Sequence, residues 1–183
     1  EIIMIYDLIV LGGGPAGYLA AERAGHEGLK VVCIEKREVG GVCLNEGCIP
    51  TKTLLYSAKT YESAIHGDKY GVTVEGAKLD HNKVIDRKEK VIKTLVSGVS
   101  ATLKANHAEV IKGDGVIKGR TAEGFNVEVN GEIVIGKRLL IATGSSPAVP
   151  PIEGLKDQLA SGFVMTSREA LELREIPAKL AVI

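Results

Sequence analysis

Hydrophobic residues recur along this chain with two periods, one typical of buried strands and the other of helices. A short, nearly continuous apolar run at residues 6–11 predicts a strand buried on both faces, and residues 30–35 predict a second one. Between them, residues 18–27 are rich in Ala and Leu and predict a helix that ends at Gly28. A strand, a helix and a second strand in this order favour an α/β fold.

The helical period returns later in the chain. Residues 53–65 predict a helix that continues from Pro50, because proline suits the first turn of a helix. Residues 80–106 carry apolar residues at helical spacing, with Asp80 as a plausible cap. We expect one amphipathic helix packed on the sheet, although the same spacing is compatible with a coiled-coil seam.

Short strands fill most of the remaining chain. Residues 109–135 alternate short apolar segments with glycines, which predicts an antiparallel β-meander laid against the parallel sheet. Another apolar strand is expected at 138–142, followed by a proline-marked extended crossover and a last apolar strand at 177–183. The expected architecture is therefore a Rossmann-like domain with a central parallel sheet, flanking helices and an antiparallel meander.

Composition narrows the class of protein. The 183 residues are 45% hydrophobic and carry 23 basic and 23 acidic side chains, so charge gives no reason to expect nucleic-acid or membrane binding. The chain contains no run of about 18 apolar residues, the length of a membrane span. The first apolar run contains Asp7 and has no basic leader, which argues against a signal peptide. We expect a cytoplasmic protein whose natural start is Met4.

A glycine-rich turn follows the first strand. Gly12, Gly14 and Gly17 form the pattern GxGxxG between strand and helix. In a dinucleotide-binding turn these glycines permit the tight turn, the approach of a pyrophosphate and close helix–strand packing. Glu35 ends the second strand at about the distance expected of the acid that binds the adenosine ribose. Many glycine-rich turns are only turns, but this full context predicts dinucleotide binding.

Two cysteines stand shortly after the second strand. In a regular helix Cys43 and Cys48 would lie roughly 7.5 Å apart along the axis, too far for a bridge, so a disulfide needs an irregular turn near Asn45 and Gly47. Cys48 would lie at the positive end of the helix that contains Pro50, where a thiolate is stabilised. The alternatives are a structural disulfide, half of a metal site and two unrelated buried cysteines. We favour a redox pair and expect no metal, since no nearby Cys or His pair completes a zinc site.

The dinucleotide-type segment that ends at Glu35 and the cysteine pair are close in sequence. A dinucleotide that extends from Glu35 could place its far end beside Cys43. Thiols react as nucleophiles towards disulfide sulfur and do not readily give a hydride to nicotinamide, whereas a flavin can take electrons from a thiolate. FAD is therefore the more plausible cofactor here than NAD.

The segment GVCLNEGCIPTK at 41–52 resembles the flavin- and disulfide-dependent pyridine nucleotide oxidoreductases, and among them the dihydrolipoamide dehydrogenases. The resemblance covers essentially the whole chain and includes a second flavin motif at 142–145. It implies that Cys48 is the thiol next to the flavin and Cys43 the interchange thiol. Lys52, one helical turn after Cys48, would then stabilise the thiolate and the reduced flavin; the alternative is a solvated lysine.

The resemblance also implies a set of FAD contacts. Gly115 would lie on the adenine side, and Val42 departs from the family pattern, which usually has Thr at that position. The expected cofactor-binding residues are Gly12, Gly14, Pro15, Ala16, Gly17, Glu35, Lys36, Gly41, Val42, Cys43, Lys52, Gly115, Ala142, Thr143, Gly144 and Ser145. Cys33, between two apolar residues, is expected to be a core thiol, and the four histidines, His26, His66, His81 and His107, are expected at the surface.

By this resemblance, residues 1–150 are an FAD-binding domain with a redox-active disulfide, and residues 151–183 are a crossover and the first strand of a nicotinamide-binding domain. The complete enzyme would be a homodimer that oxidises dihydrolipoyl groups of a lipoyl carrier protein or a 2-oxo acid dehydrogenase complex, through Cys43–Cys48 and FAD, and reduces NAD. We expect the chain alone to be inactive in turnover, because the catalytic base would lie outside it. The alternatives are a related disulfide or mercuric reductase, a non-catalytic flavin-binding redox module, and a fold relic that binds no cofactor.

Overall fold

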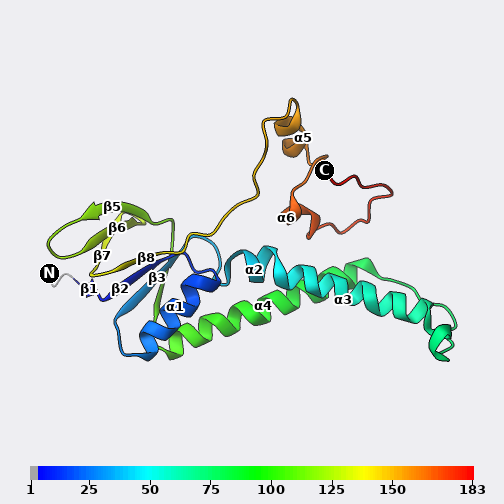
Figure 1. The fold of residues 1–183 in the computed structure, drawn as a ribbon, viewed down its shortest axis with the longest axis horizontal. Helices are drawn as coiled ribbons and strands as arrows, with labels where there is room; N and C mark the ends of the chain where they lie inside the picture. Colours follow the sequence, from blue (N-terminus) through cyan, green and yellow to red (C-terminus); the bar gives the residue numbers. More distant parts are fainter. Residues whose placement is uncertain (1–3) are drawn as a thin grey trace. The chain divides into compact units, whose positions relative to one another are not determined.

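The computed structural model describes residues 4–183, and Figure 1 shows its helices and strands. The chain divides into two compact units, Glu1–Asn45 with Thr94–Ser145 and Glu46–Lys93 with Ser146–Ile183. The first unit contains β1 Ile5–Tyr6, β2 Leu8–Leu11, α1 Pro15–His26, β3 Val31–Glu35, β4 Glu109–Lys112, β5 Val116–Arg120, β6 Phe125–Val129, β7 Glu132–Gly136 and β8 Leu139–Ile141. The second contains α3 Cys48–Ile65, the 3-10 helix η1 Gly67–Tyr70, α5 Leu155–Ser161 and α6 Ser167–Ala170, while α2 Gly41–Glu46 and α4 His81–Ala105 cross the unit boundaries.

The central sheet of the first unit is parallel, with strand order β4-β3-β2-β8. This confirms the predicted parallel sheet and corrects the extent of the meander, because Glu109–Lys112 pairs in parallel with β3 as an edge strand. The residue pattern could not reveal this, since an edge strand with charged residues at both ends has the same local sequence as a meander strand. The hydroxyl of Tyr6 donates to Glu109 Oε2 at 2.5 Å, and burial together with this contact raises the pKa of Tyr6.

A second sheet contains the predicted meander. Its order is β1-β7-β6-β5, with β5, β6 and β7 antiparallel and β1 parallel to β7. The predicted strand at 6–11 is therefore two short strands in different sheets, divided at Asp7. The carboxylate of Asp7 accepts hydrogen bonds from Lys137 Nζ at 2.7 Å and from the N–H of Lys30 at 3.0 Å, and these bonds fix the point at which the chain changes sheet.

Two apolar clusters cover the two faces of the parallel sheet. The cluster between the sheets confirms that the meander packs on the parallel sheet; its members are Tyr6, Ile9, Leu11, Val32, Ile34, Val127, Val129 and Val134. The other cluster joins the sheet to α1 and the C-terminal part of α4; its members include Val10, Ala21, Ala24, Val31, Cys33 and Leu103. The predicted amphipathic helix thus packs on the sheet through Leu103, and Cys33 is a buried core thiol, as expected.

The second unit begins at the second cysteine. Helix α3 starts at Cys48, with Pro50 in its first turn as predicted, after a break at Gly47 whose φ of −143° and ψ of −105° are not helical. Helix α4 starts at His81, and Asp80 Oδ1 accepts a hydrogen bond from the N–H of Lys83 at 3.2 Å, which confirms the predicted cap.

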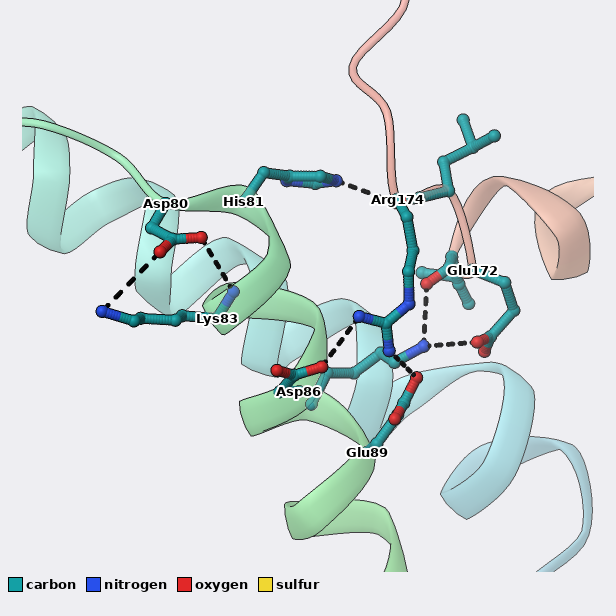
Figure 2. A network of polar contacts seen from close by, with 10 residues as sticks. Asp80, His81, Lys83, Asp86, Glu89, Glu172 and Arg174 are labelled. Carbon is teal, nitrogen blue, oxygen red and sulfur yellow. Dashed lines mark hydrogen bonds and ion pairs between the residues drawn. The ribbon is translucent and has the colours of Figure 1, made fainter.

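Polar contacts hold residues 171–174 against the N-terminal half of α4 (Figure 2). Lys88 is fully buried and pairs with Glu172 at 2.7 Å. The Nε2 of His81 lies 2.7 Å from the carbonyl oxygen of Leu173. His81 is partly exposed, because this contact covers part of its ring, and the other three histidines are exposed.

The strand predicted at 177–183 is not present. These residues have no regular secondary structure and are exposed. An isolated apolar segment becomes a strand only where a neighbouring strand accepts its hydrogen bonds, and none of the described strands pairs with it. No helix within residues 4–183 is both long enough and apolar enough to cross a bilayer.

Candidate functional site: a glycine turn beside a cysteine segment

The glycine turn at the end of β2 is fixed by close backbone contacts. Gly12 has a φ of +104°, and a Cβ there would lie 2.2 Å from the carbonyl oxygen of Ala142. A Cβ on Gly17 would lie 1.8 Å from the carbonyl oxygen of Gly12. Because real atoms cannot approach so closely, only glycine allows the chain to turn here and α1 to pack against the turn.

The carboxylate of Glu35 binds this turn directly. Its Oε2 accepts a hydrogen bond from the N–H of Gly13 at 2.7 Å, and its Oε1 accepts one from the N–H of Arg37 at 2.8 Å. The end of β3 is thereby tied to the turn that follows β2. Each carboxylate oxygen has a second lone pair, so Glu35 can still accept a hydrogen bond from a ligand hydroxyl.

The segment that precedes the first cysteine packs on the same turn. The N–H of Gly40 donates to the carbonyl oxygen of Gly13 at 2.8 Å. Gly41 has a φ of +57°, and a Cβ there would lie 2.6 Å from the Cα of Gly14. The two glycine segments therefore approach each other backbone to backbone, without side chains between them.

Both cysteines lie in or at the start of a helix. Cys43 lies in α2 and is partly exposed, whereas Cys48 is the first residue of α3, is exposed and carries a free thiol. Lys52 is exposed one turn further along α3. A disulfide between Cys43 and Cys48 stays a prediction.

The other expected ligand residues surround the turn at the ends of the strands. The N–H of Ala142 donates to the carbonyl oxygen of Leu11 at 2.8 Å, which places the start of the expected second flavin motif beside the turn. A Cβ on Gly115 would lie 2.5 Å from a methyl carbon of Leu11. The exposed candidates are Pro15, Ala16, Lys36, Val42, Thr143, Gly144 and Ser145.

The sequence did not predict the contacts of three residues of this site, although it marked Asn45 as a turn residue. The backbone N–H groups of Gly13 and Gly40 make the contacts described above, and a pattern of side chains does not predict a backbone contact. The side-chain amide of Asn45 donates to the carbonyl oxygens of Val39, at 3.2 Å, and of Gly41, at 2.9 Å, which fixes the loop before Cys43. Within residues 4–183, no group of three or more His, Cys, Asp or Glu side chains is placed to hold a metal ion.

A glycine turn between strand and helix, an acid at the end of the next strand and a neighbouring cysteine segment define a Rossmann-type dinucleotide-binding domain with redox-capable thiols. Comparison with known sequences agrees. The chain belongs to the pyridine nucleotide-disulphide oxidoreductase family, whose sequence model matches residues 6–183.

The curated relatives are similar over nearly all of this chain. A dihydrolipoyl dehydrogenase of Acholeplasma laidlawii is 44% identical over 97% of this chain and 52% of its own length. One of Mycoplasma genitalium is 42% identical over 98% of this chain and 39% of its own length. The chain thus spans about half the length of these relatives or less.

Solved structures show the same fold. The Cu(II) complex of the HOCl-induced flavoprotein disulfide reductase RclA from Escherichia coli superposes with a TM-score of 0.74, with 28% identity, over 93% of this chain and 34% of that protein. A second structure of RclA gives a TM-score of 0.71, also with 28% identity, over 94% and 35%. The predicted fold class, a Rossmann-like FAD-type domain with a meander, is confirmed.

Proposed function

We propose that this chain is the FAD-binding, redox-disulfide portion of a dihydrolipoyl dehydrogenase. The observation that carries the proposal is the hydrogen bond from Gly40 to Gly13, together with the close approach of Gly41 to Gly14. These contacts hold the segment that leads into Cys43 against the turn that would bind a dinucleotide diphosphate. An extended cofactor bound at that turn would reach the cysteine segment.

The residues of the turn fit FAD. Helix α1 begins with Pro15 at its first position, and its N-cap residue Gly14 has no side chain to satisfy the helix N–H groups. Those groups and the positive end of the helix dipole suit a diphosphate. Glu35 offers acceptor capacity to the adenosine ribose, and small residues at Gly14 and Gly41 leave the backbone accessible.

The chain's own thiols would carry out the exchange with substrate. A dihydrolipoyl dithiol reduces the Cys43–Cys48 disulfide, so that one lipoyl disulfide forms, one protein disulfide breaks, and two electrons and two protons reach the protein pair. Cys43 would be the interchange thiol and Cys48 the thiol beside the cofactor, with Lys52 on the same helix. When bound, FAD supplies an acceptor of two electrons that can pass a hydride to NAD.

Sequence similarity supports the lipoyl substrate over other disulfides. The relatives named dihydrolipoyl dehydrogenase are 36% to 44% identical to this chain, whereas the RclA structures are 28% identical. We further propose that the complete enzyme is a homodimer that serves a lipoyl carrier protein or a 2-oxo acid dehydrogenase complex. Residues from 151 onward would lead into its nicotinamide-binding domain.

Two measurements on the purified 183-residue chain test this function. The absorbance spectrum after incubation with FAD and gel filtration should show bound flavin at about one per chain. Dihydrolipoamide should reduce the protein disulfide, as counted by mass spectrometry after alkylation, yet sustained NADH formation should be absent. Failure to retain flavin would refute the cofactor assignment, and sustained turnover with NAD would refute the inactivity of this chain.

A further inference from the structure

The side-chain amide of Asn45 binds two backbone carbonyls of the loop that leads to Cys43. Its Nδ2 donates to the carbonyl oxygen of Gly41 at 2.9 Å and to that of Val39 at 3.2 Å, and both distances lie within the ordinary range for an N–H donor. Asn45 is only partly exposed, so water competes less with these bonds than it would at the open surface. All of these residues belong to the first unit.

Two backbone hydrogen bonds of the same loop are long. The nitrogen of Gly41 lies 3.4 Å from the carbonyl oxygen of Glu38. The nitrogen of Leu44 lies 3.3 Å from the carbonyl oxygen of Gly40, and both distances exceed the usual range. Gly40 and Gly41 have φ angles of +96° and +57°, and glycine allows other conformations at both positions. The shorter bonds from Asn45 therefore favour one loop conformation among several.

One peptide group joins the amide of Asn45 to the glycine turn. The carbonyl of Val39 and the N–H of Gly40 belong to this peptide, and in a trans peptide these two groups point in opposite directions. The carbonyl accepts the bond from Asn45. The N–H donates to the carbonyl oxygen of Gly13 at 2.8 Å. Asn45 therefore holds one side of the peptide, and the turn after β2 holds the other.

The orientation of this peptide decides whether the loop can bind the turn. Without the amide of Asn45, the Val39–Gly40 peptide is free to rotate, because glycine tolerates both orientations. Rotation would turn the N–H of Gly40 away from Gly13 and bring one carbonyl oxygen towards another, which is unfavourable. We propose that Asn45 is a positioning residue for cofactor binding: its amide orients this peptide and keeps the cysteine segment against the turn. The inference rests on the proposed function, in which that turn binds FAD.

Apolar contacts hold the loop on the domain independently of Asn45. Val39 and Leu44 are buried, and Val39 belongs to the cluster between the parallel sheet and its helices. A Cβ on Gly40 would lie 2.6 Å from Cδ2 of Leu44, so Leu44 packs closely on the loop. These contacts remain when Asn45 is replaced. A substitution at Asn45 should therefore leave the fold intact and change the local geometry of the loop.

The first test is the affinity for FAD of a variant that has the shape of asparagine but not its donors. Asn45→Leu keeps the number of side-chain atoms, adds no charge and removes both hydrogen bonds. The dissociation constant of the full 183-residue chain for FAD, measured by quenching of flavin fluorescence, should rise about tenfold. Asn45→Ala should raise it by a similar factor. Asn106→Leu, which removes a side-chain bond to the carbonyl oxygen of Thr102 at 3.0 Å, is the matched control and should leave it unchanged.

The second test follows the orientation of the peptide without FAD. Hydrogen exchange of the Gly40 N–H, measured by NMR, should become about tenfold faster in Asn45→Leu. The N–H of Gly12, which donates to the carbonyl oxygen of Ile34 at 2.8 Å, lies in the same turn and should keep its exchange rate. Faster exchange at both amides would show a general loosening of the domain and would overturn the specific role of Asn45.

The remaining outcomes separate this inference from the proposed function. Weaker FAD binding in both Asn45 variants, with faster exchange at Gly40 but not at Gly12, supports it. If Asn45→Leu binds FAD as tightly as the unmodified chain, or if its Gly40 exchange is unchanged, the positioning role is overturned while the cofactor assignment stands. If the unmodified chain binds no FAD, the proposed function is refuted, and the positioning role falls with it.

Discussion

The backbone N–H of Gly40 donates a 2.8 Å hydrogen bond to the carbonyl oxygen of Gly13. Gly13 lies in the turn after β2, and Gly40 lies just before α2, the helix that carries Cys43. One backbone bond thus joins the dinucleotide-type turn to the cysteine segment. The proposed function depends on this junction, and substitutions on either side of it should affect cofactor binding.

Gly41→Ala should disrupt that junction. A Cβ at residue 41 would lie 2.6 Å from the Cα of Gly14, and the φ of +57° is unfavourable for alanine. We expect a loss of about 2–3 kcal/mol in the free energy of unfolding and weak or absent FAD binding, measured by urea denaturation and by flavin absorbance after gel filtration. Gly28→Ala is the matched control, because Gly28 has a φ of +82° with no atom near its Cβ position. Equal effects of the two substitutions would show that backbone strain alone, and not the contact with Gly14, causes the loss of stability and of FAD binding.

Glu35→Gln should weaken FAD binding and leave the fold intact. The charged carboxylate binds the N–H groups of Gly13 and Arg37, and an amide keeps only one acceptor oxygen for these bonds and for a ribose. We expect the dissociation constant for FAD, measured by quenching of flavin fluorescence, to rise about tenfold. Glu38→Gln, which alters only an exposed pair with Lys112, should leave it unchanged. Equal affinity in the Glu35 and Glu38 variants would argue against a ribose contact.

The first strand, helix and strand were predictable from sequence because their signals are local. Apolar runs, the glycine turn and the stop at Gly28 act within a few residues, and the structure has α1 and β3 close to the predicted bounds. The division at Asp7 was not predictable, since it depends on Lys137, far along the chain. The parallel pairing of Glu109–Lys112 likewise depends on which strand edge is available to it.

The residues of the site also fall into those that a local sequence pattern predicts and those that it does not. GxGxxG and the acid Glu35 were identified from their spacing, but the bonds of Gly13 and Gly40 involve backbone groups that every residue has. An ion pair between Arg168 and Glu46 joins residues far apart in sequence, and each residue alone looks like an ordinary surface charge. Pairing of this kind follows from the folded structure and leaves no local pattern.

Cys33 should resist alkylation in the folded chain. Burial raises the pKa of its thiol to about 12, with the charge of Glu35 as a smaller cause. At pH 8 the thiolate fraction would be on the order of one in ten thousand, and the side chain is also inaccessible. Iodoacetamide treatment of the reduced chain followed by mass spectrometry should show modified Cys48 and unmodified Cys33, with Cys33 reacting only in urea. Modification of Cys33 at the rate of Cys48 would contradict its place in the core.

Glu172→Gln should destabilise the second unit. Lys88 is fully buried, and this substitution removes the countercharge at 2.7 Å while the carbonyl oxygen of Leu171 remains. We expect a loss of about 2–4 kcal/mol in the free energy of unfolding, because a buried charge left without its partner is costly. Glu128→Gln, in the exposed pair with Lys118, should cost less than about 1 kcal/mol. Urea denaturation measures both, and equal losses would show that the Lys88 pair has no special role.

The central proposal is that Cys48 is the thiol that would contact the bound flavin. The most direct measurement is the absorbance spectrum of the FAD-loaded chain during anaerobic titration with one equivalent of a dithiol. We predict that the dithiol generates a new charge-transfer absorbance at longer wavelength than that of free FAD. The band should be absent from Cys48→Ser, and it should be present in Cys43→Ser before any dithiol is added, because that variant has no disulfide to reduce. A loaded chain whose flavin spectrum does not respond to the dithiol, or responds equally without Cys48, would contradict the account.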